Sequence, residues 1–172
     1  MSVFSRIYRY PLWSIPVIMV VGIVFYVVIY RKCKMTFLRR FNAVIFLLSI
    51  IGILRFTVLG RSFTDERLIT LQPFISFQYA KVQPEFYRTM VMNTFLFFPF
   101  GLSMPFVLPE KCRGKLLLTL ICAFLFSTGI ELIQYFGGLG YCEVDDIICN
   151  TLGGLIGSMA YHIHIILQKN SI

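Results

Sequence analysis

The sequence predicts an all-α protein, a polytopic membrane helix bundle with about five transmembrane helices. Of its 172 residues, 58% are hydrophobic and only 14% are charged, and the mean hydropathy is +0.79. A soluble domain of this length would need more charge to cover its surface. Eighteen Phe and nine Tyr also suit a chain that faces lipid and places aromatic rings at the interface. The formal charge of +8 therefore does not by itself indicate nucleic acid as a partner.

Five apolar stretches are long enough to cross a membrane, which takes about 20 residues. They cover roughly residues 12–30, 41–60, 89–108, 116–136 and 146–167. The first follows Arg6 and Arg9, as in a signal peptide, but its apolar run is too long and no small-residue cleavage site follows it. We therefore expect a retained helix. No internal repeat or low-complexity tract divides the chain, so residues 1–172 are expected to form a single domain.

The connection between the second and third stretches, roughly residues 61–88, is the longest in the chain. It contains LITLQPFISFQYAKV, which is too apolar for a solvated linker and is interrupted by Pro73. We expect an interfacial or re-entrant segment that lies in the membrane surface or folds back over the bundle.

Basic residues set the expected orientation. Five of them crowd the loop RKCKMTFLRR (residues 31–40) and three more lie in PEKCRGK (residues 109–115), so both loops are expected to be cytoplasmic. Five spans then place the N-terminus outside and the C-terminus in the cytoplasm. Arg6 and Arg9 argue the other way but are outnumbered, and seven of the eight acidic residues fall on or near the outer side. The loop 61–88 is then external.

In this topology, unusual polar residues from four spans come to one level, the outer leaflet. An ionisable residue inside a membrane segment is costly and points to function. Glu131 and Gln134 are three residues apart, and Asp146 and Asn150 are four apart, so each pair shares a helix face. The candidate binding residues are Arg55, Arg61, Arg88, Asn93, Glu131, Gln134, Asp145, Asp146 and Asn150.

Glycines continue the polar face of the last span. Gly153 and Gly157 form a GxxxG pattern with Gly154 beside them, and Gly153 lies seven residues after Asp146 on the same face. Small residues at this spacing let a neighbouring helix backbone approach closely. We expect these three glycines to pack a helix, within one chain or between two.

Each polar residue also has a structural interpretation. Asp145 or Asp146 could be a helix N-cap, although one helix needs only one cap. Glu131 could form a structural ion pair with Arg55 or Arg61. The asparagines could join helices by hydrogen bonds, and Arg55 could reach the outer headgroups on its own.

The sequence contains no motif for the other common kinds of metal, disulfide or catalytic site. The five cysteines form no CxxC, and the two histidines have no partner at ligand spacing, so no disulfide framework or zinc site is indicated. There is no Walker loop, GxSxG motif or Ser/His/Asp set. We expect no resident cofactor, although Glu131, Asp145 and Asp146 could bind a divalent cation through oxygen ligands.

Three motifs together resemble the successive signatures of VanZ-like membrane proteins: NTFLFFPFG (residues 93–101), ELIQ (131–134) and EVDDIICNTLGGLIG (143–157). Arg61 followed by LQPFISF is similar to the family's Arg and Pro-Phe element before the third span. The resemblance covers roughly residues 40–165. The family often has an Arg just before the acidic motif, but residues 140–142 read GYC here, so no role for such an Arg can be carried over.

The resemblance implies a bacterial plasma membrane and action at the cell envelope. The named member of the family is associated with low-level resistance to the glycopeptide antibiotic teicoplanin, without a change in the peptidoglycan precursor stem. The resemblance supplies no biochemical mechanism for that resistance.

Two functions remain open. In the first, the outer cluster binds or shields a lipid-linked envelope component, with the arginines on phosphate and the amides on sugar or peptide groups. In the second, an integral membrane enzyme acts on a phospholipid or lipid-linked glycan headgroup, using Glu131, Asp145 or Asp146 as general base or metal ligand. A transporter or scaffold is least favoured because the polar residues stop near one leaflet. The expected partners are membrane lipids and a lipid-linked precursor or glycan, with no nucleic acid, and the oligomeric state is open.

Overall fold

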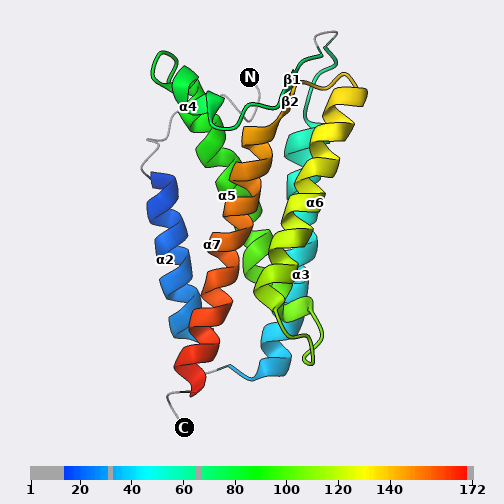
Figure 1. Ribbon diagram of the computed structural model, residues 1–172. Helices are drawn as coiled ribbons and strands as arrows, with labels where there is room; N and C mark the ends of the chain where they lie inside the picture. The colour runs from blue at the N-terminus through cyan, green and yellow to red at the C-terminus, as the bar shows by residue number, and fades with distance from the viewer. Residues whose placement is uncertain (1–13, 31–32, 65–66, 170–172) are drawn as a thin grey trace.

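The computed structural model of the protein describes residues 14–30, 33–64 and 67–169, and it is a bundle of long helices (Figure 1). Arg6, Arg9, Arg31, Lys32, Asp65 and Glu66 lie outside the described residues. In chain order the elements are α2 (Ser14–Tyr30), α3 (Met35–Leu54), a π-helical turn η1 (Arg55–Leu59), β1 (Ile69–Thr70), α4 (Ile75–Ala80), α5 (Glu85–Val107), α6 (Lys115–Phe136), β2 (Cys142–Glu143) and α7 (Val144–Lys169).

The predicted all-α membrane bundle is confirmed, and each of the five expected spans corresponds to one long helix. Among the described residues, three helices are long and apolar enough to cross a membrane: α3 continued through η1 (Met35–Leu59), α5 and α6. In α2 the apolar part Ser14–Tyr26 is shorter than these three helices. Helix α7 is not among the three, and it lies against α5, α6 and α2, so much of its surface faces protein.

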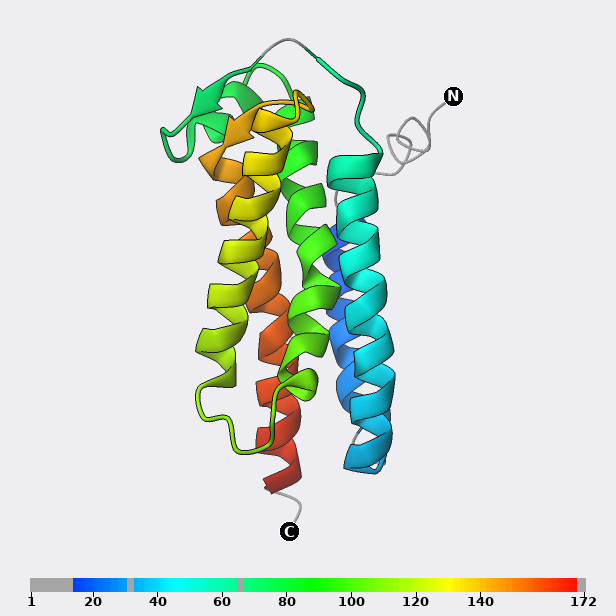
Figure 2. The same cartoon turned by 90° about the vertical axis from the view of Figure 1, so that its right-hand side faces the viewer.

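Successive long helices run in opposite directions. As a result α2, α5 and α7 begin at the end of the bundle where α3 and α6 finish (Figures 1 and 2). We call this the apical end. It also carries β1, β2 and α4, whereas α7 finishes at the opposite end.

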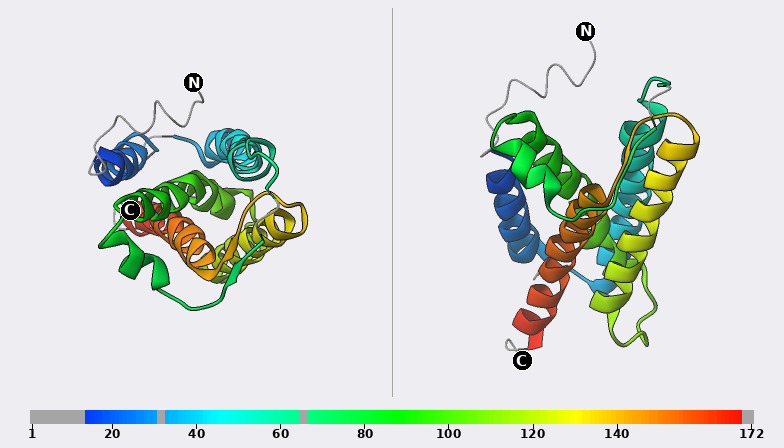
Figure 3. Two further views of the ribbon diagram at one scale, coloured as in Figure 1. Left: turned by 90° about the horizontal axis from the view of Figure 1, so that it is seen from above. Right: turned by 45° about the horizontal axis from the view of Figure 1, so that its top comes forward.

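Helices α5 and α7 form the closest pair in the bundle because glycine removes side chains from their contact. A Cβ at Gly153 would collide with the backbone of Thr94, and one at Gly157 would collide with that of Phe98. Gly101 of α5 meets Gly154 in the same way. Viewed along the bundle, α5 lies between α7 and the pair α2 and α3 (Figure 3). The GxxxG face is thus buried within one chain.

Two apolar clusters fill the remaining contacts of α5. One joins it to α2, α3 and α7 around Leu38, Phe98 and Phe106. The other joins it to α3 and α6 around Ile53, Phe97 and Phe100. Within a membrane such contacts are stabilised by close van der Waals packing, since lipid is as apolar as the core, and they make α5 the centre of the fold.

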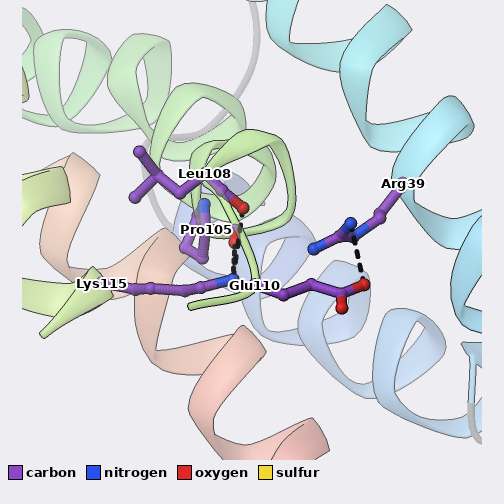
Figure 4. A network of polar contacts seen from close by, with 5 residues as sticks. All are labelled: Arg39, Pro105, Leu108, Glu110 and Lys115. Carbon is purple, nitrogen blue, oxygen red and sulfur yellow. Dashed lines mark hydrogen bonds and ion pairs between the residues drawn. The ribbon is translucent and has the colours of Figure 1, made fainter. Parts of the chain in front are cut away.

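Lys115 ties three helices together at the end opposite the apical one. Its ammonium group donates to the carbonyl oxygens of Pro105 at 2.9 Å and Leu108 at 3.4 Å, which α5 leaves unpaired where it ends (Figure 4). It also lies over the ring of Tyr161 of α7, 5.3 Å from the centroid. Beside it, Arg39 of α3 pairs with Glu110 at 2.9 Å.

The connection from η1 to α5 is described over residues 60–64 and 67–84, which fold over the α6–α7 hairpin (Figure 2). This is one of the two arrangements expected from the sequence. We call these residues the apical segment. Strand β1 pairs in parallel with β2, in the register Ile69 with Cys142. The backbone N–H of Thr64 donates to Gly138 O at 2.7 Å, and that of Cys142 donates to Leu68 O at 2.9 Å. These bonds place the apical segment directly above the polar residues of α6 and α7.

Candidate functional site

A buried polar stripe runs up one face of α6 towards the apical end. It consists of Ser127, Glu131 and Gln134, which are four and three residues apart and therefore share a face. All three side chains are at most 1% exposed. A helix that exposes Leu125 and Leu132 on its other side thus directs its polar groups inward.

Helix α7 presents a matching stripe to it. The Nδ2 group of Asn150, 2% exposed, donates to Ser127 Oγ at 2.8 Å. One turn nearer the apical end, Asp146 is also buried, and the side chain of Asn93 on α5 hydrogen-bonds to it. Three helices therefore enclose these groups. We call Asn93, Ser127, Glu131, Gln134, Glu143, Asp146 and Asn150 the polar cluster.

Glu131 joins α6 to the start of α7. Its Oε2 atom accepts the backbone N–H of Glu143 at 3.0 Å. Glu131 therefore accepts a hydrogen bond from a backbone amide. The structural interpretation of the sequence was an ion pair of Glu131 with Arg55 or Arg61. The Glu143 side chain is half-buried, and burial, followed by the nearby charge of Asp145, raises its pKa above the ordinary value.

Asp145 holds the apical segment instead of facing an arginine or a metal ion. Its Oδ1 accepts the N–H of Phe74 at 2.6 Å and its Oδ2 accepts that of Ser76 at 2.8 Å. These N–H groups belong to the N-cap residue and to the second residue of α4, so Asp145 caps the start of that helix. The cap also fixes Phe74 at a φ of 63°, a conformation that bulky residues rarely adopt.

The π-helical turn η1 provides the fourth wall. Wider π winding shifts the backbone hydrogen bonds of the turn. The carbonyl of Thr57 within it accepts Gln134 Nε2 at 2.9 Å, while the Thr57 hydroxyl donates to Ile53 O. The side-chain amide of Gln134 thus links α6 to η1, the continuation of α3, at the level of the polar cluster.

Two acceptors in the polar cluster have no partner in the described part of the chain. They are Gln134 Oε1 and Asn150 Oδ1, both buried. Leaving a buried acceptor unpaired costs about 1–3 kcal/mol. Native proteins contain few buried unpaired acceptors, so each one requires an explanation.

The three predicted arginines lie at the apical end in different settings. Arg61 is exposed beside the α6–α7 turn, where its guanidinium lies 3.5 Å from Leu139 O. It is also close enough to the carboxyl of Glu143 to oppose the rise in the pKa of that group. Arg55 is exposed and folds back over Gly60, and Arg88 is half-buried near the start of α5.

Glycine is required where Arg61 meets this turn. Gly140 has a φ of 149°, and a Cβ there would collide with the Arg61 guanidinium. The residues GYC before the acidic motif thus give room to an arginine that comes from elsewhere in the chain.

The structure brings six of the predicted residues close together: Asn93, Glu131, Gln134, Asp145, Asp146 and Asn150. It adds Ser127, Thr57 and Glu143, which were not among the candidates. Ser127 had a signal, because it lies one turn before Glu131 on the same face. In the described part of the chain, no group of three or more His, Cys, Asp or Glu side chains is arranged to hold a metal ion. The divalent cation suggested for Glu131, Asp145 and Asp146 therefore gains no support from their geometry.

Comparison with known proteins places the chain in a family. Residues 17–167 match the family described as VanZ/LLP1. A curated relative, Protein VanZ of Enterococcus faecium, is 32% identical over 76 residues, which is 44% of this chain and 45% of that protein. The match thus spans less than half the length of that relative, and no solved structure matches the chain. Because the family match covers most of the 172 residues, the protein is a member of the VanZ/LLP1 family of membrane proteins.

Proposed function

We propose that the protein binds the headgroup of a lipid-linked envelope component at its apical end and thereby shields it. The observation that carries this proposal is the pair of buried, unpartnered acceptors, Gln134 Oε1 and Asn150 Oδ1. Each can accept a hydrogen bond from a donor outside the described residues. Sugar hydroxyls, amines and peptide N–H groups are donors of this kind, and lipid-linked glycans carry many of them.

The charged residues of the apical end suit a headgroup that carries both a phosphate and hydrogen-bond donors. Glu131, Glu143 and Asp146 supply carboxylates that accept from hydroxyl or ammonium groups. Arg61 is exposed beside them, and Arg55 is exposed elsewhere at the apical end. A guanidinium can pair with phosphate through two parallel hydrogen bonds. A headgroup with a phosphate beside sugar or amine donors satisfies both sets.

The surface around the cluster supports a ligand that arrives from the membrane. The apical segment exposes large apolar side chains, among them Leu71 at 73% and Val82 at 82%. Water would disfavour such a surface, whereas the interfacial layer of a bilayer suits it. Aromatic rings, typical of that layer, are exposed along the same segment at Phe63, Phe74, Phe77 and Tyr79.

Family membership suggests the biological setting. The relative Protein VanZ and the resemblance to glycopeptide-resistance proteins point to the cell envelope. We infer that shielding a lipid-linked precursor would lower its access to teicoplanin, which needs no change in the precursor itself.

The test is mass spectrometry of lipids that copurify with the protein. We expect one headgroup class to be enriched over the bulk membrane, and we expect Glu131→Gln and Asp146→Asn to reduce that enrichment. Glu110→Gln, at an exposed carboxylate of the opposite end, is the matched control and should keep it. Lipid of bulk composition on the wild-type protein would overturn the proposal. Full resistance in both apical variants would also overturn it, because the cluster would then be structural.

The second candidate, an enzyme acting on the same headgroup, rests on Glu131 and Asp146, two buried carboxyl groups that lie close to each other. One could act as a general base. In that case Glu131→Gln or Asp146→Asn abolishes turnover while headgroup binding persists. Loss of binding in step with the lost charge instead supports the binding function.

A further inference from the structure

The carboxyl groups of Glu131 and Asp146 come level with each other inside the bundle. The bond from Asn150 Nδ2 to Ser127 Oγ, 2.8 Å long, fixes the register of α7 against α6. Glu131 lies four residues after Ser127, and Asp146 lies four residues before its own bonded partner. Because the two helices run in opposite directions, both carboxyl groups are one turn nearer the apical end than that bond. Their side chains are only 1% and 8% exposed, so two acidic groups lie close together where water is excluded.

An unpaired oxygen lies one turn away on each side of these two carboxyl groups. On the apical side, Gln134 follows Glu131 by three residues and leaves Oε1 without a donor. On the other side, Asn150 follows Asp146 by four residues and leaves Oδ1 without one. The orientation of the Gln134 amide is fixed, because its NH₂ group donates to the carbonyl of Thr57, which can only accept. These oxygens are an observation independent of the acidic charges, and they show that the polar cluster offers acceptors for a donor to fill.

A primary ammonium group suits this set of acceptors better than the other headgroup donors. It carries three N–H donors and no acceptor. Its positive charge also offsets the like charges of Glu131 and Asp146, and that attraction is strong where burial lowers the effective dielectric constant. A hydroxyl group brings one donor and no charge, and a quaternary ammonium brings the charge without a donor.

Arg61 provides a place for a phosphate next to this ammonium. It is exposed, and it lies close enough to Glu131, Glu143 and Asp146 for its charge to act on all three. Exposure falls from Arg61 through the half-buried Glu143 to the two buried carboxyl groups. These residues therefore form one path from the surface into the bundle. A guanidinium pairs with phosphate through two parallel hydrogen bonds, so a headgroup with a phosphate and a nearby ammonium matches both ends of the path.

We propose that the polar cluster binds a phosphoethanolamine headgroup, with its primary ammonium between Glu131 and Asp146 and its phosphate at Arg61. The two-carbon spacer of this group keeps the two charges close, as the neighbouring positions of Arg61 and the carboxyl groups require. The proposal rests on the function proposed above and names the headgroup that the site selects.

The test measures which phospholipid the full-length protein retains. Purified protein is stripped of lipid in detergent and incubated with equal amounts of phosphatidylethanolamine, phosphatidylcholine and phosphatidylglycerol that carry identical acyl chains. Gel filtration then removes free lipid, and mass spectrometry quantifies what stays bound. We expect phosphatidylethanolamine to be retained several-fold above the other two. Phosphatidylcholine keeps the positive charge but has no N–H donor, and phosphatidylglycerol keeps hydroxyl donors but has no positive charge.

Glu131→Gln tests the ammonium position, because the amide oxygen of glutamine can still accept the backbone N–H of Glu143. Its NH₂ group replaces the other carboxylate oxygen, so the cluster loses a charge and gains a donor. We expect the preference for phosphatidylethanolamine over phosphatidylglycerol to fall several-fold. Arg61→Gln should instead lower the retention of all three lipids, because phosphate is common to them. Glu85→Gln, at an exposed carboxylate of the apical end, is the matched control and should change neither, and melting temperatures show that the variants fold.

Retention of phosphatidylcholine or phosphatidylglycerol at the level of phosphatidylethanolamine would overturn this inference, and so would an equal loss of all three lipids in Glu131→Gln. A different headgroup enriched on the protein purified from cells would then still support the proposed function. Conversely, selection of phosphatidylethanolamine by the stripped protein, together with lipid of bulk composition on the protein from cells, would support this inference and overturn the proposed function. The two proposals therefore fail separately.

Discussion

The carboxylate of Asp145 accepts the backbone N–H of Ser76 at 2.8 Å, although 69 residues separate the two in the chain. Its other oxygen accepts the N–H of Phe74 at 2.6 Å. Hydrogen bonds to a charged group contribute about 1.5–3 kcal/mol each. The acidic start of α7 is thus the anchor of the apical segment.

We expect Asp145→Asn to loosen α4 without unfolding the bundle. An amide has one acceptor oxygen, so one of the two N–H groups loses its partner, at a cost of about 1–3 kcal/mol. Trypsin should then cleave faster after Lys81, the exposed residue that follows α4. Glu85→Gln, at an exposed carboxylate four residues further on, is the control. Cleavage at the wild-type rate in Asp145→Asn would show that the segment is held by other contacts.

The helices of this fold could be predicted because a membrane span needs only a long apolar run. The expected start of the third span, residue 89, falls one turn late because the first turn of α5 carries the charged residues Glu85 and Arg88 and lies outside that run. Strands β1 and β2 could not be predicted, because two residues each carry no periodic signal.

Five residues of the polar cluster were among the sequence candidates, whereas Ser127, Glu143 and the hydrogen bonds of the cluster were not predicted. Glu131, Asp146 and Asn150 are conspicuous because polar groups are costly in an apolar helix. The partners of Asp145 are backbone N–H groups, which almost every residue offers, so no pattern marks them. The GxxxG of α7 predicted close packing, whereas its contact at Gly101 depends on a tertiary arrangement that a single glycine does not reveal.

Gly153→Ala is expected to separate α5 from α7. The added methyl group meets the backbone of Thr94, which cannot move as a side chain does, so we expect a loss of about 1–3 kcal/mol or more. The melting temperature in detergent measures this. Gly129→Ala on α6 is the matched control, since nothing lies within 4 Å of its Cβ and alanine favours a helix by about 0.5–1 kcal/mol. Equal effects of the two variants would contradict the close α5–α7 contact.

Asn150→Leu is expected to leave stability nearly unchanged while it lowers headgroup enrichment. It leaves the buried Ser127 Oγ without its donor, at a cost of about 1–3 kcal/mol, but it removes an unpartnered oxygen whose cost is of the same size. Ser127→Ala is the contrasting variant, because it leaves Asn150 Nδ2 buried without its acceptor and should lower the melting temperature. A large loss of stability in Asn150→Leu would mean that Asn150 mainly joins the helices.

Glu143 should make stability depend on pH in the acidic range. Its pKa in the folded protein is raised above 4.5 by burial and by Asp145, so the folded state binds the proton more tightly than the unfolded state. This contribution to the free energy of unfolding is present below pH 4.5 and is lost as the pH rises through the raised pKa of Glu143. Glu143→Gln removes this dependence, so the variant should gain melting temperature relative to wild type on going from acidic to neutral pH. Glu85→Gln gives the background effect of removing one exposed carboxylate, and an equal gain there would contradict the assignment.

Cys142 and Cys112 report the orientation of the bundle, because they lie in connections at its opposite ends. The basic loops predict that Cys142 faces outward and Cys112 the cytoplasm. In single-cysteine variants on intact cells, an impermeant maleimide should therefore label Cys142 and spare Cys112 until the cells are opened. Burial and the nearby Glu131 raise the pKa of the Cys142 thiol, so its labelling should be slow at neutral pH and faster at alkaline pH, because the thiolate is the reactive form. Labelling of Cys112 alone would invert the topology and place the polar cluster in the cytoplasmic leaflet, where an envelope ligand could not reach it.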